Sequence, residues 1–149
     1  MEIKIKKIGG EDHEYIEIGC HSESSRVRAI VKFVKGLEGS VTGSKGEKIY
    51  EIPVVDIFYI ESVDNRTFLY SSKDSYETSL KLYEFEDLLK ERGFIRISKS
   101  VVVNVMKVDS IKPAFNGRFL CKLSNGEDVI ISRKYVSEFR EFISRRSGS

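Results

Sequence analysis

Hydrophobic and polar side chains alternate with a period of two along much of the chain, a pattern that predicts short, half-buried β-strands. The first two such runs, residues 2–8 and 14–20, are separated by a glycine pair and predict two short strands. Residues 24–39 change to the helical period, with serines before the first apolar residue and glycines near the end, and predict a helix of about three turns. The apolar face of this helix, which must be buried somewhere, consists of Val27, Ile30, Val31, Val34 and Leu37.

A stretch rich in glycine and serine, residues 40–48, divides the chain. Such a composition predicts a linker or an exposed hairpin tip. We therefore expect two parts, a small ββα-like extension over residues 1–45 and a larger domain over residues 46–145. The extension could cover the sheets of the larger domain, mediate dimerisation or contact another protein.

The larger domain is predicted to be mainly β. Strand-like runs cover residues 47–62, with a break at Pro53, and then form a hairpin with its turn near residues 73–74. Short runs separated by turn-forming pairs follow from residue 94 to residue 132. A helix over residues 134–143 is predicted near the end. An earlier helix, ended by Gly93, has an apolar side predicted to consist of Leu80, Tyr83, Leu88 and Leu89.

One strand-like run, RISKSVVVN at residues 96–104, has a lysine where its alternation calls for an apolar side chain. Strict alternation would bury Lys99 on the same side as Val101 and Val103. Because an unpaired buried ammonium is costly, we expect the chain to turn or bulge at residues 98–100 and to expose Lys99. Hydroxyl groups beside an exposed cation suit a phosphate backbone. A solvated lysine at a corner explains the pattern alone equally well.

Charge is distributed unevenly, although the formal net charge is only +2. Residues 47–91 carry 5 basic and 11 acidic side chains, whereas residues 92–134 carry 9 basic and 3 acidic ones. This polarity predicts an anionic partner for the basic segment.

The sequence lacks the usual groups of enzyme and metal sites. It has no Gly-rich phosphate loop, no HExxH motif, no Cys/His dyad and no histidine in the basic segment. We therefore predict no catalytic residue, no metal site and no cofactor. No apolar run approaches the roughly 18 residues of a membrane span, and the charged, alternating N-terminus is unlike a signal peptide. A cytoplasmic protein is expected, with no membrane partner.

Several segments of the larger domain match one known family in order. FYIES at residues 58–62 comes first, FIRISKSVVVNV at residues 94–105 follows a predicted helix, and IISRKYV at residues 130–136 follows a predicted hairpin. With SLKLYEFEDLL at residues 79–89 and the NGR and LSNGEDV turns, these segments resemble the LytTR-type DNA-binding domain of bacterial transcription regulators. The extension is too short for a receiver domain, so the chain resembles stand-alone members of this family.

The resemblance implies a mainly β fold of three small antiparallel sheets with one or two short helices. It also implies binding to double-stranded DNA through three loops instead of a recognition helix, and two copies of the chain on repeated half-sites. The loops follow the IES strand, interrupt FIRISKS and begin SRKYV. Carried over position by position, they place these residues at the DNA: Asn65, Arg66 and Thr67; Ser98, Lys99 and Ser100; Arg133 and Lys134. Arg118, in the NGR turn, is an expected phosphate contact.

The candidates differ in what they can recognise. Arg133 is the first base-reading candidate, because a guanidinium can bond a guanine edge through two N–H groups. Lys99 is second and Arg66 third. The family usually has His-Arg where this chain has Ser98-Lys99, so the chain keeps the cation and loses the imidazole and the planar fork.

Two other functions stay open at this point. The chain could be a single-stranded nucleic-acid binder that stacks bases on aromatic rings, although alternation within strands favours core packing for them. These aromatics are Phe58, Tyr59, Phe68, Tyr70, Phe115 and Phe119. The other alternative is a protein-interaction module that keeps the fold and binds a partner through the helix of the extension.

Two polar residues also have open roles. Asn104 follows three valines, and its expected role is to satisfy backbone groups at a strand end. Glu61 either pairs with Arg96 or Lys99 or faces solvent.

Overall fold

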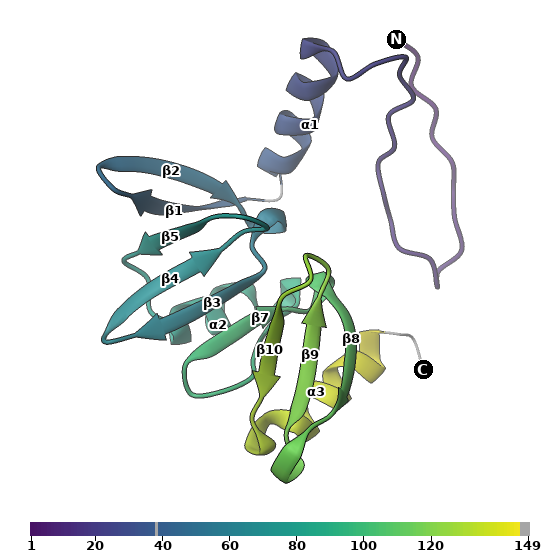
Figure 1. Ribbon diagram of the computed structural model, residues 1–149. Coiled ribbons are helices and arrows are strands. Elements are labelled where there is room, and N and C mark those ends of the chain that lie inside the picture. Colours follow the sequence, from purple (N-terminus) through teal and green to yellow (C-terminus); the bar gives the residue numbers. More distant parts are fainter. Residues whose placement is uncertain (38, 147–149) are drawn as a thin grey trace.

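The structure, a computed structural model, describes residues 1–37 and 39–146. Within these ranges the chain forms three α-helices and two antiparallel sheets (Figure 1). The larger sheet has seven strands in the order β2-β1-β5-β4-β3-β7-β6, and the smaller has three in the order β10-β9-β8. The predicted mainly β fold is confirmed, but the described strands form two sheets and not three. No helix among the described residues combines the length and the apolar character needed to cross a membrane.

Most of the helices and strands lie where the alternation and turn patterns predict them. The strands are β1 Ser40–Lys45, β2 Lys48–Pro53, β3 Tyr59–Val63, β4 Arg66–Tyr70, β5 Ser75–Thr78, β6 Phe94–Arg96, β7 Val101–Asn104, β8 Val108–Pro113, β9 Phe119–Leu123 and β10 Asp128–Ile131. The helices are α1 Ser25–Leu37, α2 Leu82–Leu89 and α3 Arg133–Arg146. β1 and β2 pair from Ser40↔Pro53 to Lys45↔Lys48, so residues 45–48 are a hairpin tip. This hairpin spans residues 45 and 46, where the sequence suggested a boundary.

The first 24 residues differ from their prediction. No strand forms among them, so the predicted pair of strands is wrong. Ile3 and Ile5 are 88% and 93% exposed. A two-stranded hairpin with nothing packed on its apolar face is only marginally stable, which explains why alternation alone does not produce strands here.

The helix predicted for the extension is confirmed by α1. The Ser24 hydroxyl caps its first turn by accepting a hydrogen bond from the Val27 N–H at 3.3 Å. Val27 is buried and Val31 is exposed, so the apolar face is covered only in part. The side chain of Leu37 lies outside the described residues. The Lys35 ammonium forms an ion pair with Asp56 at 3.1 Å, which joins α1 to the segment between β2 and β3.

The core has two parts, on opposite faces of β7 and of β6, the last strand of the larger sheet. Phe94 and Val102 belong to the part that includes α2 and the larger sheet, whereas Ile95 and Val103 belong to the part that includes the smaller sheet and α3. Because both faces are covered, this pair of strands has no wholly polar face. Because β6 is buried on both faces, the chain must leave the core after this strand before it can expose Lys99.

The apolar side of α2 is rotated from its prediction. Leu82 and Phe85 are buried, whereas Tyr83 and Leu88 are 62% and 67% exposed. The helix begins only at Leu82, and positions 82, 85 and 89 then share a face. The predicted stop at Gly93 is confirmed, because Gly93 has a φ of 91°, a left-handed conformation that glycine adopts without steric cost.

Candidate nucleic-acid interface

The three predicted loops lie along one side of the molecule. The Ser62 N–H, at the end of β3, donates to the Ser100 carbonyl at 2.8 Å, and the Ser132 N–H, just before α3, donates to the Ile97 carbonyl at 2.8 Å. The loop between β6 and β7 is therefore bonded on one flank to the strand that leads into the β3–β4 turn and on the other to the start of α3. In Figure 1 these three segments follow the lower side of the molecule.

The central loop exposes its lysine, as the alternation predicted. Ile97 is fully buried and its N–H donates to the Val101 carbonyl at 3.0 Å, so the hairpin closes around residues 98–100. Lys99 is exposed at the tip, between the partly exposed Ser98 and Ser100. The Ser98 hydroxyl accepts a hydrogen bond from the Ser100 N–H at 3.2 Å. Of the expected turn or bulge, the structure has a turn, and the outward lysine is confirmed.

Arg96 binds the backbone of this loop. Its Nε donates to the Ser98 carbonyl at 2.7 Å, and a second nitrogen donates to the Lys99 carbonyl. Its third nitrogen forms an ion pair with Glu86 of α2. Glu61, the partner suggested by the sequence, instead accepts a hydrogen bond from the Tyr70 hydroxyl at 3.2 Å. That suggested pairing is wrong.

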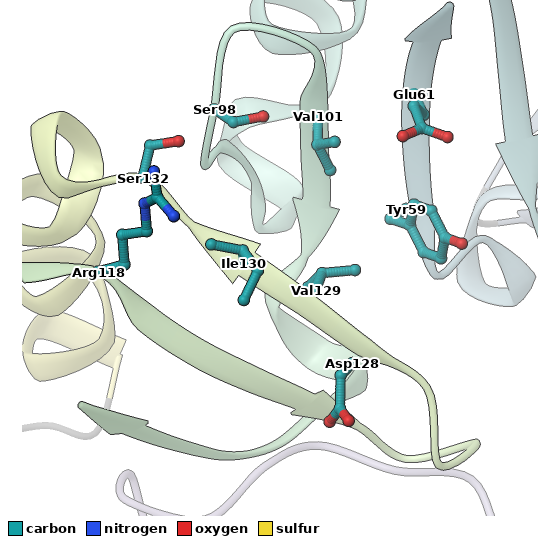
Figure 2. A pocket seen from close by; sticks show the side chains of 9 residues that line it. All are labelled: Tyr59, Glu61, Ser98, Val101, Arg118, Asp128, Val129, Ile130 and Ser132. Atoms are coloured by element: carbon teal, nitrogen blue, oxygen red, sulfur yellow. The ribbon is translucent and has the colours of Figure 1, made fainter. Parts of the chain in front are cut away.

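Two neighbouring hollows lie beside Arg118 and Ser132, and the first also reaches Ser98 of the central loop. The first, of about 380 Å³, runs between β10 of the smaller sheet and β3 and β7 of the larger one (Figure 2). The second, of about 320 Å³, is lined by Asn116, Arg118, Ser132 and Arg133. Arg118 and Ser132 line both. Figure 2 shows Arg118 extending toward Ser132, with Ser98 across from it. We call the group formed by Ser98, Asn116, Arg118, Ser132 and Arg133 the Ser132 cluster.

Arg133 owes its place in the Ser132 cluster to a glycine. Gly117 has a φ of +76°, and a Cβ there would lie 2.9 Å from the Arg133 Cδ. The stem of Arg133 therefore lies on the bare backbone of the turn between β8 and β9. Asn116 has a φ of 59°, a left-handed conformation that asparagine tolerates. The sequence marked Asn116 only as a turn residue, so its place beside Arg133 was missed.

The β3–β4 turn is built differently. Asp64 and Asn65 both have positive φ, at 50° and 63°, as expected for a tight two-residue hairpin turn. The following residue, Arg66, is bound to Glu77 of β5 through two hydrogen bonds of 2.9 and 2.7 Å. Thr67 is only 3% exposed, so its side chain presents almost no surface to a partner.

The Arg66–Glu77 pair affects both titrations. The Glu77 hydrogen bond and charge raise the pKa of Arg66. The Arg66 hydrogen bond lowers the pKa of Glu77, and its charge acts in the same direction. The arginine also lies over the Phe68 ring at 5.3 Å. This cation is therefore occupied within the protein.

Carboxylates neutralise the cations unevenly. Some of the acidic residues between 47 and 91 form ion pairs with basic side chains. These pairs are Asp56–Lys35, Asp74–Lys45, Glu77–Arg66 and Glu86–Arg96. In the part of the chain that the structure describes, Lys99, Arg118, Arg133 and Lys134 form no ion pair, and all four are exposed. Four exposed cations without an ion pair among the described residues therefore lie at the central loop, in the β8–β9 turn and at the start of α3.

Asn104 has the structural role expected of it. It is buried, its Nδ2 donates to the Ile57 carbonyl at 2.8 Å, and its Oδ1 accepts from the Met106 N–H at 3.0 Å. The asparagine thus satisfies backbone groups where β7 ends.

Most of the aromatic rings are not displayed for base stacking. Phe58 is in the core, and Tyr59 and Phe119 pack against it, as the alternation predicted. Tyr59 and Tyr70 stack on each other at 4.4 Å. Phe115 departs from that prediction, because it is 83% exposed.

Most of the larger domain is similar to known proteins. The family model of the LytTr DNA-binding domain matches residues 47–144. The transcriptional regulatory protein YpdB of Escherichia coli K12 is 34% identical over 100 residues, which are 66% of this chain and 41% of that protein. The chain thus spans about two-fifths of that relative. An uncharacterized HTH-type transcriptional regulator of Staphylococcus aureus is 27% identical over 146 residues, or 97% of this chain and 99% of that one.

A solved structure is also similar. It is the LytTr DNA-binding domain of a putative methyl-accepting/DNA response regulator from Bacillus cereus, with a TM-score of 0.67 and 31% identity over 70% of this chain and 96% of that one. Strands separate the three described α-helices of the present chain, so no two of these α-helices form a helix-turn-helix. The matched region contains strands β2 to β10 and the three loops described above, and the chain belongs to the LytTR DNA-binding domain family.

Proposed function

We propose that this protein is a cytoplasmic bacterial transcription regulator that recognises double-stranded DNA through the loops described above. The observation that carries the proposal is the gathering, beside hydroxyl groups, of exposed cations that form no ion pair within residues 1–37 and 39–146: Lys99 on the central loop, and Arg118 and Arg133 around Ser132. Phosphate oxygens accept hydrogen bonds from such side chains and supply much of the affinity of DNA-binding proteins.

The residues differ in their proposed roles. Arg133 reads a base, because its guanidinium forms no ion pair with any described residue and its stem is fixed on Gly117. Arg118 and Lys134 bind phosphates. Lys99 reaches a phosphate or a base from the loop tip. Asn116, which neighbours Arg133, becomes an additional candidate.

The remaining candidates have smaller roles in this proposal. Ser98 and Ser100 flank Lys99 and can donate hydroxyl protons to phosphate oxygens. Asn65 is exposed at the tip of the β3–β4 turn and contacts the backbone of the duplex. Arg66 contributes little while it is bound to Glu77, and Thr67 leaves the set because it is buried.

The main test is an unbiased selection of duplex sequences by the purified full chain from a random pool. We expect a defined motif, repeated as two half-sites that hold two copies of the chain. Affinity for the selected duplex should fall steeply as salt rises. Preference for either single strand over the duplex would replace this proposal with single-strand binding. No enrichment at low salt, together with a stable protein complex from cells, would favour a protein-interaction module.

A further inference from the structure

The guanidinium of Arg96 is committed to the central loop from which Lys99 projects. Its three nitrogens bind three different acceptors, namely the carbonyls of Ser98 and Lys99 and the carboxylate of Glu86. The two carbonyls belong to consecutive peptide groups, so both are oriented by one planar cation. The fork geometry of arginine permits this, whereas the single ammonium of a lysine does not reproduce it.

Arg96 is poorly placed to bind DNA itself. Its side chain is 22% exposed, and each of its nitrogens already has a partner. It lies on strand β6 beside the fully covered Phe94, on the face that packs against α2. Its contribution must therefore act through the loop that it holds.

Glu86 has a matching function on the helix. Its carboxylate is the charged partner of Arg96, and it fixes the guanidinium between the end of α2 and the loop. A negative charge near a DNA-binding surface weakens binding through the overall field. Its presence here is explained if the gain from orienting Arg96 exceeds that loss.

We propose that Arg96, oriented by Glu86, is a positioning residue that pre-forms the loop of residues 98–100 so that Lys99 meets DNA without further ordering. This inference rests on the proposed function. Loop residues that are fixed before binding lose less conformational entropy when the complex forms. The pair thus raises affinity without touching the nucleic acid.

A double-mutant cycle on the selected duplex tests this role. Arg96→Lys keeps the charge and removes the fork, and we expect about a tenfold loss of affinity, with the dependence on salt unchanged. In the Lys99→Ala background the same change should cost less than about twofold, because the cation that the loop presents is gone. Equal losses in both backgrounds would show that Arg96 does not act through Lys99.

A second pair of variants distinguishes loop positioning by Arg96 from a simple charge effect, because the two predict opposite changes in DNA affinity. Glu86→Ala and its control Asp56→Ala each remove one carboxylate from one ion pair. Asp56 pairs with Lys35 of α1, and in Figure 1 α1 lies at the opposite end of the molecule from the three loops. A charge effect alone would strengthen DNA binding in both variants. We expect Glu86→Ala to weaken it and Asp56→Ala to leave it unchanged or slightly stronger. Stronger binding by Glu86→Ala would overturn the inference.

A measurement on the free protein keeps the inference distinct from the proposed function. Amide order parameters from NMR should fall at Lys99 and Ser100 in the Arg96→Lys variant. The order parameters of β9 should stay unchanged, which would show that the variant is folded. If wild-type protein bound no DNA, the proposed function would fail while this loop measurement still stood. If the loop stayed equally ordered in the variant, the positioning role would fail even though wild type binds DNA.

Discussion

The β3–β4 turn and the Ser132 cluster each present an arginine beside a predicted DNA-facing loop, yet only one of these arginines is free. Arg66 is held by two hydrogen bonds that it donates to Glu77 on the neighbouring strand. Arg133 has no ion pair among the described residues and rests on Gly117 at the edge of a hollow. A cation at a position that matches the family motif is therefore available to DNA only when it forms no ion pair within the protein.

The largest expected effect is the loss of sequence recognition in Arg133→Ala. Discrimination between the selected duplex and a random one should fall by about 1–3 kcal/mol, because bidentate base contacts carry energies of this size. Lys134→Ala is the matched control, since it should weaken binding to both duplexes alike. Competition binding at fixed salt measures both. Unchanged preference in the Arg133 variant would remove its base-reading role.

The next largest effect is on the stability of the protein, at Thr67, which is buried whereas Asn65 and Arg66 are exposed. Thr67→Ala should lower the free energy of unfolding by about 1 kcal/mol, as is common for changes at buried positions. DNA affinity should stay unchanged, since the side chain is 3% exposed. Denaturant unfolding and duplex binding are measured on the same sample. Reduced affinity in a fully folded variant would return Thr67 to the interface.

Turn and alternation patterns predicted these strands well because they report local geometry. The β4–β5 hairpin with its turn near residues 73–74, the outward Lys99 and the cap-like Asn104 all follow from residues near one another in sequence. The Arg66–Glu77 pair does not, because it depends on the register in which Phe68 faces Glu77 across β4 and β5. A contact diagonal to that register becomes visible only once the strands are paired.

The other errors have the same origin. Alternation in residues 2–8 predicted a strand without showing whether anything would cover it, and nothing does so for Ile3 or Ile5. Asn116 was treated as a turn former because the dipeptide signal is local. Its neighbour Arg133 is in another element, so only the packing of the β8–β9 turn on α3 brings them together.

A smaller effect should appear when Arg66 is released from its partner. Glu77→Gln removes the charge that holds Arg66, so the guanidinium can reach a phosphate and the dependence of affinity on salt should steepen by about 0.9 per added contact. Binding to random duplexes at several salt concentrations measures this slope. The double variant Arg66→Ala with Glu77→Gln should lose the change. An identical slope in wild type and Glu77→Gln would mean that the ion pair does not restrain Arg66.

The smallest expected effect is in the titration of Glu77 itself. Its pKa is lowered from the ordinary value of 4.5, first by the hydrogen bond from Arg66. A depressed carboxyl pKa means that the ion pair contributes to stability above the unfolded-state value and loses that contribution as the pH falls through the folded-state value. Both side chains are well exposed to solvent, so the energy involved is small. NMR titration should find the Glu77 carboxyl ionising below pH 4.5 in wild type and closer to 4.5 in Arg66→Ala. Identical titration curves in the two proteins would show that Arg66 is as free as Arg133, and the contrast between the two regions would then disappear.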